Sequence, residues 1–172
     1  MTRETLIIAF RFIFLVLVQV VILNNIYFFD YINPNLYVLF VLLYPIETKR
    51  ANFLVISFLL GLTIDIFSNS GGINAAATVA MAYLSFPILK IILNSPDTDF
   101  KLFRLSEVPF LRILFYVSTL VFIHHFVLFS LEYANLNEIG TIFYKTINTS
   151  IFTIFLCTVS IYLTGKTPPS NL

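Results

Sequence analysis

The sequence predicts an all-α integral membrane protein, a bundle of six transmembrane helices that forms one domain over residues 1–172. Two observations carry this prediction: long apolar runs recur along the chain, and charge is scarce. Hydrophobic residues make up 59% of the 172 residues and charged residues 11%, against about 45–50% and 25% in soluble domains. Ten basic and nine acidic side chains are too few to cover a soluble globule, so a soluble enzyme is excluded.

The same composition excludes other classes of protein. The net charge is +1, and nucleic-acid binding is excluded because phosphate contacts need clustered Lys and Arg. The single cysteine, Cys157, excludes an internal disulfide framework and a cysteine-based zinc site. A transmembrane β-barrel is excluded because its strands alternate apolar and polar residues, whereas residues 12–18 are apolar on every face.

A helix that crosses a membrane needs roughly 20 mostly apolar residues, and its backbone polar groups must bond within the segment. Six segments are predicted on this basis: 6–23, 34–48, 51–67, 72–93, 110–133 and 141–163. The segment 34–48 begins with Asn33-Pro34, which is typical of a helix start. As a helix it is about 22 Å long at 1.5 Å per residue, short of a membrane core of about 30 Å. A re-entrant segment is therefore the alternative there.

The distribution of basic residues predicts the topology, since cytoplasmic loops carry an excess of Lys and Arg. With the N-terminus in the cytoplasm, the outer side holds only Lys145. The inner side holds Arg3, Lys49, Arg50, Lys90, Lys101, Arg104, Arg112 and Lys166. This bias alternates correctly across all five loops, which favours six spans and places both termini in the cytoplasm.

Polar and ionisable side chains within the spans are candidates for function, because such groups usually face the bundle interior or lie near an interface. They are Arg11, Gln19, Asp65, His124, His125 and Glu132. Arg11 is interpreted as reaching the cytoplasmic headgroups with its long stem.

Asp65 lies at the outer end of its span, four residues after Gly61, so the two share a helix face. We expect Gly61 to let a neighbouring helix approach closely and Asp65 to bond across to it. The alternative is that Asp65 reaches outer water or helps form the turn before Gly72. Asn74 opens the next span, and Ala76 with Ala80 forms a pair of small residues typical of close helix contact.

His124 and His125 lie in the outer half of the fifth span, and Glu132 follows His125 by almost two turns on the same face. Adjacent histidines point about 100° apart on a helix, so they chelate a metal poorly, and a structural hydrogen-bonding role is favoured over a metal site or proton transfer. Catalytic and phosphate-binding motifs are absent from the sequence. We predict no catalytic, cofactor or metal site, and we assign Asp65, Asn74, His125 and Glu132 to an internal cavity or a partner-docking groove.

The stretch Gly61-Leu62-Thr63-Ile64-Asp65, followed by Gly72-Ile73-Asn74-Ala75, resembles the signature of the rod shape-determining protein MreD family. That family shows Gly-x-x-x-Asp at the end of one span and Gly-x-x-Ala at the start of the next. The resemblance covers about residues 5–165, and the His124-His125 pair with Glu132 is similar to the version found in Bacteroidetes-type bacteria.

The resemblance implies a non-enzymatic component of the cell-elongation machinery in the bacterial inner membrane, which regulates cell shape and peptidoglycan synthesis. Its implied partner is an MreC-like protein, linked indirectly to MreB, to RodA and to a class B penicillin-binding protein. The implied fold is similar to that of the substrate-binding S-components of energy-coupling-factor transporters. A vitamin-binding S-component is the alternative function, although a first span with one alanine, Ala9, among bulky residues counts against it. The sequence leaves the oligomeric state open.

Overall fold

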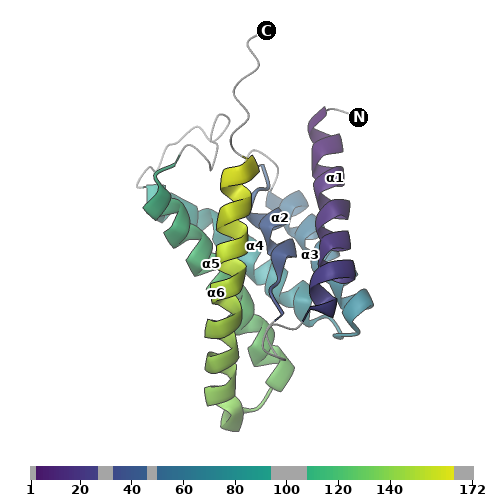
Figure 1. Ribbon diagram of the computed structural model, residues 1–172, viewed down its shortest axis with the longest axis vertical. Helices are drawn as coiled ribbons and strands as arrows, with labels where there is room; N and C mark the ends of the chain where they lie inside the picture. Colours follow the sequence, from purple (N-terminus) through teal and green to yellow (C-terminus); the bar gives the residue numbers. More distant parts are fainter. Residues whose placement is uncertain (1–2, 27–32, 46–49, 94–107, 165–172) are drawn as a thin grey trace.

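The computed structural model describes residues 3–26, 33–45, 50–93 and 108–164. Its long helices are α1 (Arg3–Leu17), α3 (Arg50–Ser68), α4 (Ile73–Leu93), α5 (Phe110–Tyr133) and α6 (Ile139–Thr164). A short helix, α2 (Leu39–Leu42), lies among them. Helix α4 packs side by side with both α3 and α5, and α5 packs against α6 (Figure 1).

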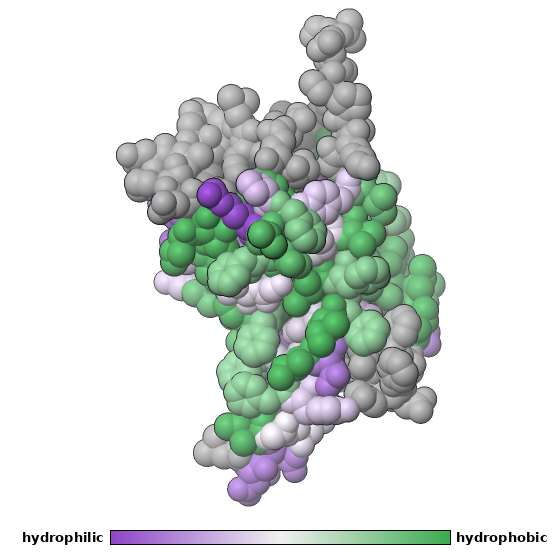
Figure 2. Space-filling view, turned by 60° about the vertical axis from the view of Figure 1, so that its left-hand side comes forward, coloured by the Kyte–Doolittle hydropathy of each residue, from purple (hydrophilic) through white to green (hydrophobic). Residues whose placement is uncertain are grey.

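Within the described ranges, five helices are long and apolar enough to cross a membrane: Thr5–Asn25, Arg50–Ser68, Ile73–Ile92, Phe110–Tyr133 and Ile139–Leu163. Their outward faces carry large apolar side chains, such as Phe10 with 71% and Leu111 with 74% of its surface exposed. Apolar residues cover most of the described surface on the face shown in Figure 2. The chain is therefore a multi-pass membrane protein, and the predicted spans 51–67, 72–93, 110–133 and 141–163 each match a helix.

The first span continues beyond α1 through a π-helical turn, η1 (Val18–Ile22), and a 3-10 turn, η2 (Leu23–Asn25). The wider turn contains Gln19, whose side chain is fully buried. π-helical turns often occur where a functional or packing demand interrupts the α-helical pattern. Here the interruption brings a polar side chain of α1 into the bundle.

The segment predicted as the span 34–48 does not form one continuous helix. The structure shows a 3-10 turn, η3 (Leu36–Val38), followed directly by α2, and residues 46–48 lie outside the described part. These two elements are roughly 12 Å long, too short to cross a core of about 30 Å as a helix. Tyr37 and Val38 are fully buried, so neighbouring helices rather than lipid surround this segment.

The segment 34–43 runs antiparallel to the first span, because α1 bonds to one of its ends and η1 to the other. Gln19 Nε2 donates to the carbonyl of Pro34 at 3.2 Å, and Arg11 Nη1 donates to the carbonyl of Leu43 at 2.7 Å. The last carbonyls of a helix lack partners within that helix, and Arg11 supplies one at the end of α2. The interpretation of Arg11 as reaching only the headgroups is therefore wrong.

The C-terminal ends of the first span and of α3 lie together, since Asn24 Nδ2 donates to Ser68 Oγ at 3.0 Å. Consecutive long helices that end on the same side run in the same direction. The start of α1 and the end of α6 lie at the same end of the molecule (Figure 1). Lys49, Lys101, Arg104 and Lys166, used in the topology prediction, lie outside the described residues.

Candidate functional site: a buried polar network

Asp65 joins the end of α3 to the start of α4. Its Oδ1 accepts hydrogen bonds from the Asn74 amide at 2.9 Å and from Ser70 Oγ at 2.6 Å, and its Oδ2 accepts from the Ala75 amide at 2.8 Å. The first amides of a helix have no partners within it, and a carboxylate there is stabilised by the helix dipole. Asp65 thus bonds across to the next helix and also closes the turn, so both roles considered from the sequence are present.

Gly61, one turn before Asp65 on α3, packs against the same first residues of α4. A Cβ atom at Gly61 would lie 2.5 Å from Ala75 Cα and 2.6 Å from the carbonyl oxygen of Asn74. Only a residue without a side chain permits this approach between backbones. Gly61 and Asp65 therefore form one contact surface on α3, and we call their contact with Asn74 and Ala75 the α3–α4 clamp.

Gly72 is required by the turn rather than by packing. Its φ of +95° lies in a region that L side chains rarely adopt, and a Cβ there would meet nothing within 4 Å. The carbonyl of Gly72 accepts from the Ala76 amide at 3.0 Å, inside the first turn of α4.

Ala76 does not make the predicted close helix contact. Its side chain is exposed, whereas Ala75 and Ala77 are 2% and 0% exposed. The bonds from Asp65 to Asn74 and Ala75 fix the rotation of α4, and that rotation turns Ala75 toward α3 and Ala76 outward. The small residue at the contact is therefore one position earlier than the Ala76–Ala80 pair indicated.

Asn74 extends the clamp into the bundle interior. Its Nδ2 donates to Asp65 Oδ1 and to Ser70 Oγ, so its Oδ1 is the atom left to accept, and Tyr37 donates its hydroxyl proton there at 2.8 Å. Tyr37 has only one hydroxyl proton, so toward His124 Nε2, 2.9 Å away, its oxygen accepts. His124 therefore carries its proton on Nε2.

His125 anchors the residues just before Tyr37. Its Nδ1 lies 2.8 Å from the carbonyl of Val121, which only accepts, so Nδ1 carries the proton. Its Nε2 faces Asn35 Nδ2 at 3.4 Å and Thr153 Oγ1 at 3.5 Å. Thr153 gives its proton to the carbonyl of Thr149 and accepts from the Asn35 amide. His125 Nε2 thus accepts from Asn35.

These bonds meet on residues 33–37, which α1, α4, α5 and α6 all hold. Gln19 completes the set: besides its bond to Pro34, its Oε1 accepts from the Tyr37 amide at 3.4 Å. We call the polar network the set Gln19, Asn35, Tyr37, Asp65, Asn74, His124, His125 and Thr153. Most of these side chains are fully buried, and buried polar groups are favourable only when they bond to one another.

Glu132 does not belong to the polar network. It is exposed in the last turn of α5, because α5 continues for almost two turns beyond His125 toward the surface. The ammonium group of Lys145 lies over the same end of α5, 4.9 Å from the centre of the Tyr133 ring and 5.8 Å from that of Phe129. The prediction of an internal cavity shared by Asp65, Asn74, His125 and Glu132 is therefore wrong for Glu132, and the docking groove stays a prediction.

Sequence reasoning missed Asn35, Tyr37 and Thr153 as members of this site. Tyr37 and His124 are 87 positions apart, so nothing local indicates their contact. The one available signal is that polar Asn33 and Asn35 flank a proline directly before an apolar segment. It indicates that these amides find partners inside the protein when the segment is buried.

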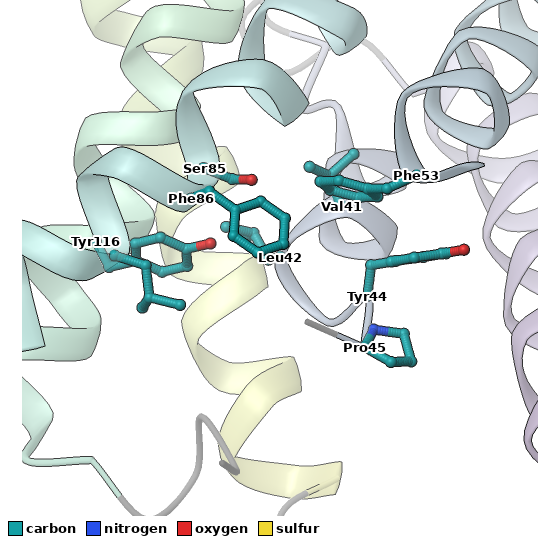
Figure 3. A pocket seen from close by; sticks show the side chains of 9 residues that line it. Val41, Leu42, Tyr44, Pro45, Phe53, Ser85, Phe86 and Tyr116 are labelled. Carbon is teal, nitrogen blue, oxygen red and sulfur yellow. The ribbon is translucent and has the colours of Figure 1, made fainter. Parts of the chain in front are cut away.

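A cavity of about 20 Å³ lies apart from this network, among α2, α3, α4 and α5. Its lining is mostly aromatic and aliphatic, with Ser85 and Tyr116 contributing hydroxyl groups (Figure 3). This volume holds about one water molecule, whereas sites for small organic ligands span roughly 300–1,000 Å³.

The members of the polar network bond to each other, so their described hydrogen bonds join the helices of the bundle. Among the described residues, no three His, Cys, Asp or Glu side chains are grouped closely enough to hold a metal ion. Comparisons of the chain with protein-family models, with curated proteins and with solved structures find no match.

Proposed function

We propose that this protein is a non-enzymatic scaffold of the bacterial cell-elongation machinery, similar to MreD, in the inner membrane. In this role it binds an MreC-like partner and so regulates cell shape and peptidoglycan synthesis, with MreB, RodA and a class B penicillin-binding protein as indirect partners. The observation that carries the proposal is the α3–α4 clamp. Of the residues that resemble the family signature, Gly61 and Asp65 make this contact, and Gly72 permits the turn that leads into α4.

The geometry of the clamp explains why a scaffold would keep these residue types together. Glycine permits contact between backbones, the carboxylate caps the next helix, and the second glycine permits the turn between them. The result is a rigid helical hairpin whose other faces remain apolar. Side chains on its exposed surface, such as Ile66 with 71% and Phe67 with 62% exposure, are available to lipid or to a partner helix.

We further propose six crossings with both termini in the cytoplasm. Helices α1 and α3 run in the same direction, so the chain between them returns across the bundle. The buried segment 34–43, antiparallel to α1, supplies part of that return. Six crossings place both termini on one side, in agreement with the bias of basic residues toward the cytoplasm.

The alternative, a vitamin-binding S-component, gains no support from the cavity described above. A volume of about 20 Å³ is more than tenfold below the usual range for such ligands. Purification of the protein with a tightly bound vitamin would reverse this ranking.

The proposal is tested by co-purifying the protein with the MreC-like protein of the same organism. We expect a complex with the native sequence and a weakened complex with Asp65→Ala, because loss of the carboxylate frees the start of α4. Cells that carry this variant as their only copy should become wider and rounder.

A matched control separates docking from folding. Ile151→Ala alters an apolar side chain on α6, outside the α3–α4 hairpin, that is 58% exposed. Both variants are first compared by size-exclusion chromatography and circular dichroism, and only monodisperse, helical samples are used for co-purification. Failure of the native protein to bind the MreC-like partner contradicts the proposed function, and an Asp65→Ala variant that binds normally contradicts the role of the clamp.

A further inference from the structure

The polar network uses both of its histidines in their neutral forms. His124 donates from Nε2 to Tyr37, and its Nδ1 is buried without a hydrogen-bond partner in the described part of the chain. His125 donates from Nδ1 to the carbonyl of Val121, and its Nε2 accepts from Asn35. The two rings lie 5.1 Å apart, centre to centre.

A further proton on either ring disturbs these contacts in the described part of the chain. On His124 it would produce a buried N–H group without a described partner. On His125 it would turn the contact with Asn35 Nδ2 into one between two donors, and the acceptor left nearby is the Thr153 hydroxyl oxygen, 3.5 Å away. A buried charge without a partner costs several kcal/mol, and the adjacent ring makes a second charge more costly. The arrangement observed is therefore one that only neutral rings satisfy.

In the part of the chain that the structure describes, few groups can offset such a charge. From α3, Asp65 reaches His124 only through Asn74 and Tyr37. From η3, the titratable group that faces the pair is the Tyr37 hydroxyl, and from α6 the facing group is the hydroxyl of Thr153. Asp65 is thus the one carboxylate of the network, and it is two residues away from the nearer ring.

We propose that His124 and His125 form a proton-operated latch on residues 33–37. Neutral rings hold Asn35 and Tyr37 in the bundle, and protonation of the pair releases them. Since these residues begin the buried segment 34–43, acidification on the outer side loosens that segment while the α3–α4 clamp and the α5–α6 pair stay in place. This role is independent of the function proposed above.

The direction in which pH changes the opening of residues 33–37 follows from the linkage between proton binding and opening. Opening exposes the histidines to water, where their ordinary pKa is about 6.5, so the open state binds more protons than the closed state as the pH falls. The closed state is therefore favoured above about pH 6.5 and loses stability below it. Between pH 7.5 and 5.5, one linked proton raises the population of the open state about tenfold, and two raise it about a hundredfold.

Hydrogen exchange of the full chain in lipid nanodiscs at pH 7.5 and 5.5 tests the latch, with exchange times corrected for the intrinsic pH dependence of amide exchange. We expect the corrected exchange of peptides from residues 33–43 to rise at least tenfold at pH 5.5, with little change in α6. Equal corrected exchange at the two pH values overturns the proposal.

Two variants test whether the histidines cause the pH dependence of exchange in residues 33–43. His124→Gln with His125→Gln supplies side-chain amides that do not titrate, so the pH effect on residues 33–43 should disappear. Gln19→Met removes an anchor of the same segment that does not titrate, and it should raise exchange at both pH values while keeping their ratio. A double variant that retains the full pH effect overturns the assignment to the histidines, as does a Gln19→Met variant that loses it.

Discussion

Single residues in this protein determine individual contacts between helices, either through their small size or through the hydrogen bonds they can make. Gly61 is the clearest case, because its missing side chain is what allows α3 to touch the backbone of α4. Gly140 provides a contrast within the same chain: it also lies in a helix, α6, yet a Cβ there would meet nothing within 4 Å. The two glycines therefore differ in function although they look alike in the sequence.

This contrast gives a prediction for Gly61→Ala. The added methyl group would lie 2.5 Å from Ala75 Cα, so the helices must separate, and overpacking of this kind costs about 1–3 kcal/mol. Gly140→Ala should be neutral or stabilising by up to about 1 kcal/mol, because alanine favours the helix. Denaturant unfolding in detergent, followed by circular dichroism, compares the two variants. Equal stability of the Gly61 and Gly140 variants would contradict the clamp.

Helices show how far the sequence alone determines this fold. The four spans from α3 to α6 follow from runs of apolar residues that end at polar turns, and this local pattern is sufficient to place their ends. The segment 34–48 is different, because Asn35 and Tyr37 find their partners on α5 and α6, far away in the sequence. Periodicity carries no information on such contacts, so the short buried helix and the contributions of Asn35, Tyr37 and Thr153 to the polar network were not predictable.

Helix α4 contains a second contact between residues that are far apart in the sequence. Pro87 has no N–H group to donate to the carbonyl of Tyr83 one turn earlier, and Arg50 Nη2 donates to that carbonyl at 3.3 Å. The guanidinium group also lies 4.8 Å from the centre of the Tyr83 ring. Arg50 thus supplies the hydrogen bond that Pro87 cannot donate within α4.

A double-mutant cycle tests this pairing. Arg50→Ala alone should destabilise the protein by about 0.5–1 kcal/mol, as is typical for an exposed hydrogen bond and cation–π contact. In the Pro87→Ala background, an amide is present to satisfy the Tyr83 carbonyl, so the same Arg50→Ala change should cost less. Unfolding midpoints of the four proteins give the coupling energy, and an additive cycle would show that Arg50 and Pro87 act independently.

At the scale of the whole molecule, the described part of the chain combines an apolar exterior with a cluster of buried polar groups near the end of α3 and the start of α4. Hydrophobic side chains cover the long helices, while the buried polar groups gather around residues 33–37. These residues connect α1, α4, α5 and α6, so the segment that is too short to be a membrane helix is the one that ties the bundle together. The six-crossing topology proposed above therefore depends on the path of the chain from α1 to α3.

The most direct test of that path is the side of the membrane on which each terminus lies. A short protease-sensitive tag is placed at either end of the chain, and a cysteine at exposed Asn137, in a Cys157→Ser background, marks the outer side. In intact spheroplasts, six crossings predict that both tags are protected while Asn137→Cys reacts with a membrane-impermeant maleimide. Cleavage of one tag but not the other would mean an odd number of crossings and would contradict a return through residues 34–43.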